Sequence, residues 1–269
     1  MPELPEVETT VRGLAACLEG ETITRAEVRR PDLRRPFPAG LVQALTGARV
    51  THLSRRAKYG LIHFRGLVMV FHLGMSGRWR IDPPELDRHD HLVLETGNGR
   101  LLALNDARRF GSVDLVEADC LAQFAPFAGL GPEPLGEELT PQKLAAQLAG
   151  RKSAIKTMLL DQRIVAGLGN IYVAEALHRA RIRPDKAAGA VSKPALQRLV
   201  PAIRDVLNES IAAGGSSMRD FVQPDGALGY FASEWQVYGR EGQPCRCGGV
   251  VKRMVQGGRS TFWCPTCQR

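Results

Sequence analysis

The sequence contains no long apolar run. No stretch of about 18 consecutive apolar residues occurs, so we expect no membrane-spanning helix. The longest candidate segment, Leu67–Leu73, is short enough to be a buried strand. The first residues have no basic segment followed by an apolar stretch, so we expect no signal peptide and a soluble, cytoplasmic protein.

The sequence also lacks internal repeats and low-complexity tracts, and this absence argues against a solenoid and against a largely disordered chain. Apolar residues make up 44% of the composition, which is enough to build real cores. The length of 269 residues suits two domains of ordinary size, or one large domain.

The N-terminal half lacks an excess of either charge. Residues 1–130 carry 17 Lys and Arg against 16 Asp and Glu, whereas residues 131–269 carry 19 against 12. Nearly all of the net charge of +8 therefore lies in the second half. A basic half favours a polyanion partner, and nucleic acid is the commonest one, although a merely soluble basic surface would look the same.

Cysteine is almost absent outside the C-terminal tail. Cys17 and Cys120 lie far from the rest, and we expect them to be reduced. The other four form two close pairs separated by sixteen residues: Cys245, Cys247, Cys264 and Cys267. This layout predicts a zinc ribbon held by four thiolates, although the first spacer is one residue short. Two disulfides or unpaired thiols are the alternatives.

The order of predicted elements suggests two kinds of structure. Residues 5–19 have the apolar spacing of a helix. Short apolar runs at 49–53, 61–64, 67–73, 79–81, 91–95, 101–104 and 113–116 follow, with the spacing of a β-sandwich or barrel. The Gly/Pro-rich stretch 129–136 predicts a domain boundary. Helices are expected at 141–148, 153–161, 171–180 and 193–213, and a hairpin with the cysteines from 235 onward.

Several blocks, in order along the chain, resemble the formamidopyrimidine-DNA glycosylases. The opening Met-Pro-Glu-Leu-Pro-Glu-Val-Glu is one of them. The others lie at 55–59, 72–77, 106–111, 131–135, 167–172, 225–231 and 236–240. Each block is weak evidence alone, but together they cover the whole chain.

The resemblance implies an α+β multidomain fold. It implies an N-terminal β-sandwich with flanking helices (1–130), a helical helix-two-turns-helix domain (131–234) and a C-terminal zinc ribbon (235–269) with one structural zinc ion. It also implies that a monomer binds damaged double-stranded DNA between its domains, at the nucleoid. The implied activity is removal of oxidised purines, such as 8-oxoguanine and formamidopyrimidines, followed by cleavage of the strand.

Four residues are the expected catalytic groups. Pro2, once Met1 is removed, would be the nucleophile, because a secondary amine forms a charged iminium with the opened sugar. Glu3 would transfer protons. Lys58 and Arg259 would hold the phosphates that leave. Alternatively, Pro2 only begins a helix and Glu3 only favours its N-terminus. Glu6 could steady the amine or simply lie in the first turn.

Further residues are expected to contact DNA. Met75, Arg108 and Phe110 match the group that fills the gap left by a flipped nucleotide, with Arg108 on the unpaired cytosine. Asn170 opens a helix that could bind phosphate, or is a plain N-cap. His89, Arg151 and Lys156 are expected phosphate contacts by their position in the blocks. Met75 could instead be a core residue and Phe110 a strand residue. Ala107 stands where proline is common, which puts the stiffness of this loop in doubt.

Two other functions remain possible from the sequence. The related endonuclease VIII type shares the proline, the glutamate and the zinc ribbon, but it prefers oxidised pyrimidines. Leu4 and the complete group of Met75, Arg108 and Phe110 argue against it. A protein that binds damage without cutting it would result if Met1 were retained. Trapping with borohydride separates an enzyme from a protein that only binds, because only an imine becomes covalently linked to DNA. Comparing an 8-oxoguanine:cytosine duplex with a thymine glycol duplex separates the two kinds of enzyme.

Overall fold

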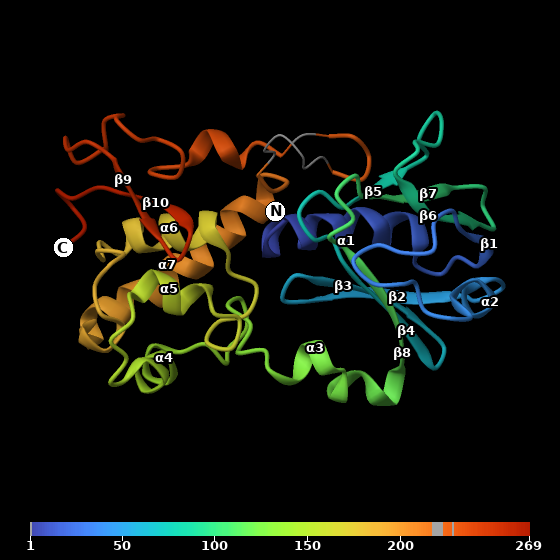
Figure 1. Cartoon of the computed structure of the whole chain (residues 1–269), viewed down its shortest axis with the longest axis horizontal. Coiled ribbons are helices and arrows are strands. Elements are labelled where there is room, and N and C mark those ends of the chain that lie inside the picture. The colour runs from blue at the N-terminus through green and yellow to red at the C-terminus, as the bar shows by residue number, and fades with distance from the viewer. Residues whose placement is uncertain (1, 217–222, 228) are drawn as a thin grey trace. The chain divides into compact units, whose positions relative to one another are not determined.

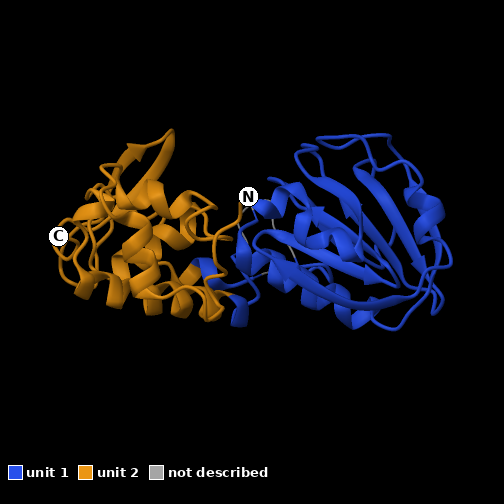
Figure 2. Cartoon of the chain, turned by 90° about the horizontal axis from the view of Figure 1, so that it is seen from below, with its two compact units in different colours: residues 1–128, 211–232 blue, residues 129–210, 233–269 orange. Residues whose placement is uncertain are grey.

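The structure is a computed structural model that describes residues 2–216, 223–227 and 229–269 (Figure 1). It divides into two compact units (Figure 2). Unit 1 comprises residues 1–128 and 211–232, and unit 2 comprises residues 129–210 and 233–269. Unit 1 is therefore built from two separate segments of the chain. No helix among the described residues is long and apolar enough to span a membrane.

Unit 1 contains two four-stranded antiparallel sheets. The first has the order β1-β6-β7-β5, with β1 (Ile23–Val28), β5 (Arg78–Ile81), β6 (Asp90–Thr96) and β7 (Leu101–Asn105). The second has the order β2-β3-β4-β8, with β2 (Val50–Arg56), β3 (Tyr59–Phe64), β4 (Leu67–His72) and β8 (Ser112–Glu117). The inward side chains of both sheets form one core, as the alternating apolar runs predict.

Helix α1 (Leu4–Leu18) belongs to the same core. Val7, Val11, Leu14 and Leu18 recur at helical spacing and pack against the strands, and Pro5 lies in the first turn. The outer face of the second sheet is covered separately, by the 3-10 helix η1 (Ala118–Gln123) and α3 (Ala125–Ala128). The short helix α2 (Leu41–Leu45) completes this unit. The burial of α1 fixes the start of the chain against the sheets.

Unit 2 is helical apart from one hairpin. Its helices are α4 (Pro141–Leu148), α5 (Ile155–Leu160), α6 (Asn170–Arg179) and α7 (Lys193–Ala212), which continues into unit 1. The short 3-10 helix η2 (Ala188–Ala190) also lies in this unit, and η3 (Phe231–Glu234) begins in the second segment of unit 1 and ends in unit 2. The hairpin pairs β9 (Lys252–Gln256) with β10 (Arg259–Trp263). The predicted α+β architecture of sandwich, helical region and cysteine-bearing hairpin is confirmed.

The turn between α5 and α6 is fixed by one glutamine. The Gln162 amide donates to the carbonyls of Leu160 and Leu168 at 3.0 and 2.9 Å, and its oxygen accepts the Gly167 N–H at 2.8 Å. Gly167 has φ +85°, which few other residues adopt. This loop therefore sets the direction in which α6 begins.

Candidate active site and nucleic-acid interface

The start of the chain is buried and clamped. Pro2 is buried and Glu3 is only 3% exposed, at the N-terminus of α1. The carboxylate of Glu6, itself buried, accepts the N–H of Glu3 at 2.8 Å through one oxygen and the N–H of Ser216 at 2.9 Å through the other. Glu6 is thus not a solvated first-turn side chain. It holds the backbone that carries Pro2 and Glu3.

Lys58 lies in a tight turn beside this helix. The turn joins β2 to β3, and Ala57 adopts a left-handed φ of +53°, which is uncommon for a residue other than glycine. The Arg55 guanidinium donates to the Ala57 carbonyl at 2.9 Å and to the Glu8 carboxylate of α1 at 2.9 Å. A single arginine therefore ties the turn that carries Lys58 to the helix that carries Glu3.

His72 lies close to this group at the end of β4. Burial, together with the positive charges of Lys58, Arg34 and Arg35, lowers the pKa of His72 to about 4. The ring is therefore neutral near pH 7. Its Nδ1 accepts the Gly74 N–H at 3.0 Å, so the proton resides on Nε2. The sequence did not single out His72 as a site residue, although it begins one of the family blocks.

A second group of candidates lies on a rigid pair of loops in unit 1. The buried Asp106 carboxylate accepts the Ser76 hydroxyl at 2.6 Å and the Gly111 N–H at 2.8 Å. Ser76 in turn accepts the Arg108 N–H at 3.1 Å. At Gly74, an added Cβ would lie 2.4 Å from the backbone of Phe110, so only glycine allows this approach. The loop of Met75 is thereby held against the loop of Arg108 and Phe110.

The side chains of Arg108 and Phe110 contact each other on this pair of loops. Phe110 is 45% exposed and lies between β7 and β8, outside the strands. The guanidinium of Arg108 lies over its ring, 4.9 Å from the centroid. Arg109 has φ +56° and its guanidinium is 3.4 Å from the Asp32 carboxylate instead. Met75 is half-buried. An exposed ring with a stacked cation suits contact with nucleobases.

His89 lies in the adjoining loop. Its carbonyl accepts the Asp106 N–H at 3.0 Å, and its ring nitrogen Nε2 accepts from Arg88 at 3.0 Å. Asp90 is buried, forms a 2.7 Å ion pair with Arg80 and accepts the Asp87 N–H at 2.7 Å. Two buried aspartates, Asp90 and Asp106, therefore brace the loops that carry the predicted contacts Met75, His89, Arg108 and Phe110.

In unit 2, three predicted phosphate contacts meet at the hairpin. Arg259 is exposed and follows Gly257 and Gly258, which have φ of +54° and +72° and form the two-residue turn. The Asn170 amide, at the start of α6, donates to the Ser260 carbonyl at 2.9 Å. Among the described residues, no carboxylate pairs with Arg259. The positive end of α6 thus lies beside an exposed arginine.

Lys156 is placed differently from an ordinary surface cation. Its side chain is fully buried, and its ammonium donates to the Thr261 hydroxyl at 2.6 Å and to the Ser260 carbonyl at 3.2 Å. Burial of a lysine is costly unless its charge is well bonded. The lysine therefore holds β10 in place directly behind Arg259. Arg151, in contrast, is exposed in the loop between α4 and α5.

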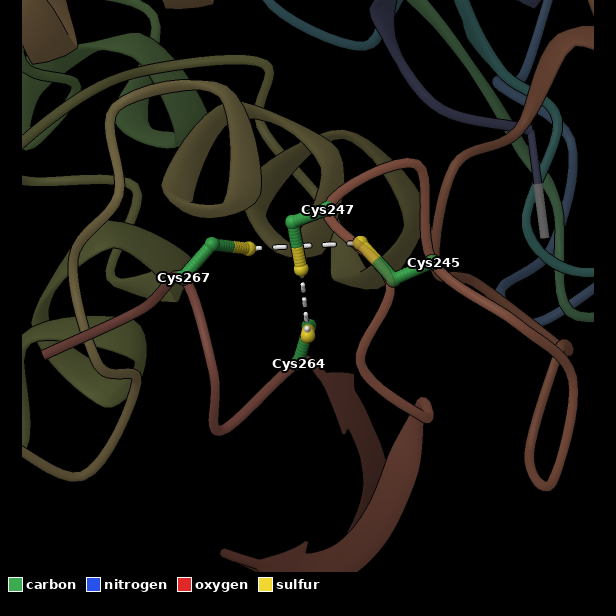
Figure 3. A group of neighbouring side chains, drawn as sticks. All are labelled: Cys245, Cys247, Cys264 and Cys267. Atoms are coloured by element: carbon green, nitrogen blue, oxygen red, sulfur yellow. Dashed lines mark hydrogen bonds between the residues drawn. The ribbon is translucent and has the colours of Figure 1, made fainter.

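The four tail cysteines converge at one point (Figure 3). Their sulfur atoms all lie within 4.8 Å of one another, with 3.5 Å between Cys247 and Cys264 and 4.0 Å between Cys245 and Cys267. A disulfide needs about 2.05 Å, so both sulfur pairs are far too long for one. Zinc thiolates with bonds of about 2.3 Å place their sulfurs about 3.8 Å apart in a tetrahedron. The donor set therefore fits one structural Zn²⁺.

The surroundings of this site support a metal centre. Gly249 is required there, because an added Cβ would lie 2.3 Å from Thr266 and 3.0 Å from the Cys264 sulfur. The buried Glu175 of α6 accepts the backbone N–H groups of Gln236, Val237 and Tyr238 at 2.8 to 3.0 Å. This carboxylate ties the hairpin region to the helix. Nothing in its spacing marks Glu175 in the sequence, and only the fold reveals this role.

Three family models match the chain. They describe the formamidopyrimidine-DNA glycosylase N-terminal domain (residues 1–113), the formamidopyrimidine-DNA glycosylase H2TH domain (130–222) and a zinc finger found in FPG and IleRS (242–269). The predicted zinc ion and the predicted family resemblance are both confirmed.

Curated relatives and solved structures agree with these models. The formamidopyrimidine-DNA glycosylases of Novosphingobium aromaticivorans and Rhizorhabdus wittichii are 69% and 66% identical, over 100% of both chains in each case. A complex of the Lactococcus lactis Fpg with DNA containing an abasic site is 34% identical, with a TM-score of 0.92 over 100% of both chains. The MutM (Fpg) protein of Thermus thermophilus is 39% identical, with a TM-score of 0.88 over 99% of this chain and 98% of that one.

Proposed function

Because the chain belongs to the formamidopyrimidine-DNA glycosylase family and is a base-excision repair glycosylase acting on damaged DNA, we propose that it removes oxidised purines and then cleaves the strand. The substrates are 8-oxoguanine and ring-opened formamidopyrimidines, and the second activity is that of an AP lyase. The observation that carries the proposal is the buried start of α1, where Pro2 and Glu3 are held by Glu6.

Pro2 is the nucleophile once Met1 is removed. A free α-amine has a pKa of about 8, so part of it is neutral near pH 7 and can attack C1′. The C1′–N bond to the damaged base breaks, and the base leaves with a proton. Opening of the sugar gives an iminium between Pro2 and C1′. This cation accepts electrons as a proton leaves C2′ and the 3′ phosphate departs, and a second elimination releases the 5′ phosphate.

Glu3 moves the protons in these steps. Its carboxyl group protonates the ring oxygen as the sugar opens, and it accepts a proton in a later step. The bonds from Glu6 to the Glu3 N–H and to the Ser216 N–H support this role, because they fix the backbone on both sides of the reacting pair. A general acid must be held at a fixed position relative to the atom that it protonates.

The phosphates are held by cations from both units. Lys58 binds phosphate at the lesion, and its turn is made rigid by Arg55. Arg259 binds phosphate from the exposed hairpin tip and favours the second elimination, with Asn170 beside it. Lys156 contributes positive charge and holds the hairpin. Arg151, exposed in its loop, contacts the phosphate backbone farther away.

The loops of unit 1 occupy the space left by the flipped nucleotide. Phe110 stacks or intercalates, Met75 fills apolar space, and Arg108 reads the unpaired base opposite. The stacked pair of Arg108 and Phe110 supports this assignment, because Arg109 is engaged with Asp32 instead. His89 contacts the backbone from the adjoining loop.

The proposed organisation follows the same residues. The catalytic domain is residues 1–130, the helix-two-turns-helix domain is 131–234, and the zinc hairpin is 235–269. We propose that one chain forms the working enzyme, because a single chain carries the proposed nucleophile and all the proposed phosphate contacts. It works on the nucleoid in the cytoplasm, where its substrate lies.

Borohydride trapping tests the proposal. Purified protein without Met1 is mixed with duplexes that contain 8-oxoguanine opposite cytosine, thymine glycol, or no damage, and the covalent complex is measured. We expect strong trapping with 8-oxoguanine and much less with Pro2→Gly, which keeps an amine but loses the secondary iminium and the rigidity of the ring. Faster reaction with thymine glycol would indicate the endonuclease VIII type. Tight binding without trapping or excision would indicate a protein that recognises damage only.

A further inference from the structure

The two turns that carry the zinc thiolates are unequal. In the longer turn, Pro265 and Thr266 separate Cys264 from Cys267. In the shorter turn, Arg246 alone separates Cys245 from Cys247. Loss of one residue from the spacer removes one amide from the turn. Hydrogen bonds of this kind orient metal ligands and tune their affinity.

A histidine from another element lies where a second donor is needed. His178 is in the last turn of α6, and its Nε2 is 3.3 Å from the Cys245 sulfur. Its Nδ1 is buried, and no described group bonds to it. A zinc-bound thiolate carries no proton, so the ring proton belongs on Nε2 and is donated to sulfur.

We propose that His178 is a positioning residue for the zinc centre, whose Nε2–H supplies to the Cys245 thiolate the donor that the short turn lacks. The helix holds the ring in place, because Glu175 on α6 binds three backbone N–H groups of the same region. Four thiolates complete the tetrahedron, so His178 acts through Cys245 rather than on the metal.

The site is open to reagents, which makes the proposal measurable. A cavity of about 530 Å³ is lined by His178 together with Cys245, Cys247 and Cys267. A chelator can therefore approach the metal from this side. Arg179, Arg181 and Arg246 line the same cavity together with Glu209 and Glu234, and Arg179 pairs with Glu209.

The experiment is a double-mutant cycle on the full-length zinc-loaded protein. One change is His178→Phe, which keeps a ring and removes the donor. The other is insertion of one alanine after Arg246, which restores a two-residue spacer and its amide. The rate of zinc release to an excess of a chromophoric chelator is measured for all four proteins. The cobalt(II) charge-transfer spectrum reports the thiolate environment independently of activity.

We expect His178→Phe to weaken zinc about 10- to 100-fold in the natural spacer and to have little effect after the insertion. His178→Gln, which retains an N–H donor, should restore most of the loss. His52→Phe is the matched control, an exposed histidine of β2 in unit 1, and should leave release unchanged.

Three outcomes of the zinc-release measurements would overturn the proposal. They are unchanged zinc release in His178→Phe, an equal effect in both spacer backgrounds, and failure of His178→Gln to differ from His178→Phe. If the inserted alanine prevents zinc binding, the zinc-release rates of His178→Gln and His178→Phe in the natural spacer decide the question by themselves. A cobalt(II) band that does not respond to His178→Phe also counts against it.

Discussion

Unit 1 and unit 2 hold their candidate residues by different means, although a buried carboxylate of unit 2, Glu175, also accepts backbone N–H groups. In unit 1, buried carboxylates accept backbone N–H groups: Glu6 beneath the start of the chain, and Asp106 and Asp90 beneath the loops. In unit 2, the buried ammonium of Lys156, the half-buried amide of Asn170 and the four-cysteine metal site support an exposed arginine. The charge of the sequence follows the same division, with +1 over residues 1–130 and +7 over 131–269.

The difference suits the two tasks proposed for these residues. Covalent chemistry needs a nucleophile and a proton carrier in a fixed geometry, shielded from water, and a carboxylate that binds backbone amides provides this without neutralising a cation. Phosphate binding needs accessible positive charge on a rigid support. Changes in the two units should therefore have separable effects, which the following experiments measure.

The largest effect is expected from Glu3→Gln. The amide keeps the shape of the side chain but cannot transfer protons, so single-turnover excision should fall about 10²- to 10⁴-fold. Binding to a damaged duplex should be nearly unchanged, because the phosphate contacts remain. Rapid-quench kinetics and a binding titration on the same duplex check this. Glu27→Gln, on the exposed face of β1, is the control. Weakened binding with normal chemistry would contradict the assignment.

The converse experiment removes the metal from unit 2. Without zinc, the hairpin loses its folding energy and Arg259 loses its support. DNA affinity should fall about 10- to 150-fold, the loss expected for one charged hydrogen bond of about 1.5–3 kcal/mol. As the control, adding zinc back should restore the full DNA affinity. Affinity that survives complete chelation, checked by metal analysis, would show that Arg259 does not depend on the metal.

A smaller effect concerns the opposite base. An unmatched buried donor costs about 1–3 kcal/mol, so lesions opposite cytosine should react about 5- to 150-fold faster than those opposite adenine. Arg108→Ala should flatten this ratio as well as slow the reaction. The ratio is measured from single-turnover rates on duplexes that carry the lesion opposite cytosine and opposite adenine. Arg109→Ala is the matched control, and loss of the preference in that variant alone would transfer the role to Arg109.

The smallest effect is on stability below neutral pH. The folded-state pKa of His72 is about 4 against an ordinary value of 6.5, because burial and nearby cations oppose its charge. The unfolded chain therefore binds more protons between these values, so stability is full above pH 6.5 and is lost as pH falls toward 4. The loss should be about 1–3 kcal/mol.

Denaturant unfolding at pH 7 and pH 4.5 tests this dependence. His72→Asn should reduce the pH dependence, because its amide oxygen can still accept the Gly74 N–H but the side chain does not titrate. His89→Asn, in a half-buried loop position, serves as the comparison. An unaltered pH slope in His72→Asn would assign the dependence to other groups.

Local patterns predicted most of the regular structure. The helix at 5–19 and all seven predicted strands correspond to α1 and β2 to β8. Strand β1 was missed because its register shifts between Ile23 and Arg25, which breaks the alternation of buried residues. Helix α2 has only five residues, too few for a helical period to show. The short helices η1 and α3 were missed as well.

The site residues also divide into those that the sequence predicts and those whose role depends on contacts between distant segments. The cysteines were predictable, because spacing alone brings them together. The burial of Lys156 was not, since a lysine is normally exposed and only the position of Thr261, far along the chain, reveals its partner. The clamps of Glu6 and Glu175 likewise depend on contacts between distant segments.

The bond from the Ser216 N–H to Glu6 has a consequence for synthesis. Its two residues are 210 positions apart, and the second segment of unit 1 begins only at residue 211. At about 5–20 residues per second, a ribosome needs about 10–40 s to make the intervening chain. The nascent protein therefore contains most of unit 2 before the support of its own first residues can form. The bond between Ser216 and Glu6 therefore forms late, and a chain released early would carry Pro2 without this support.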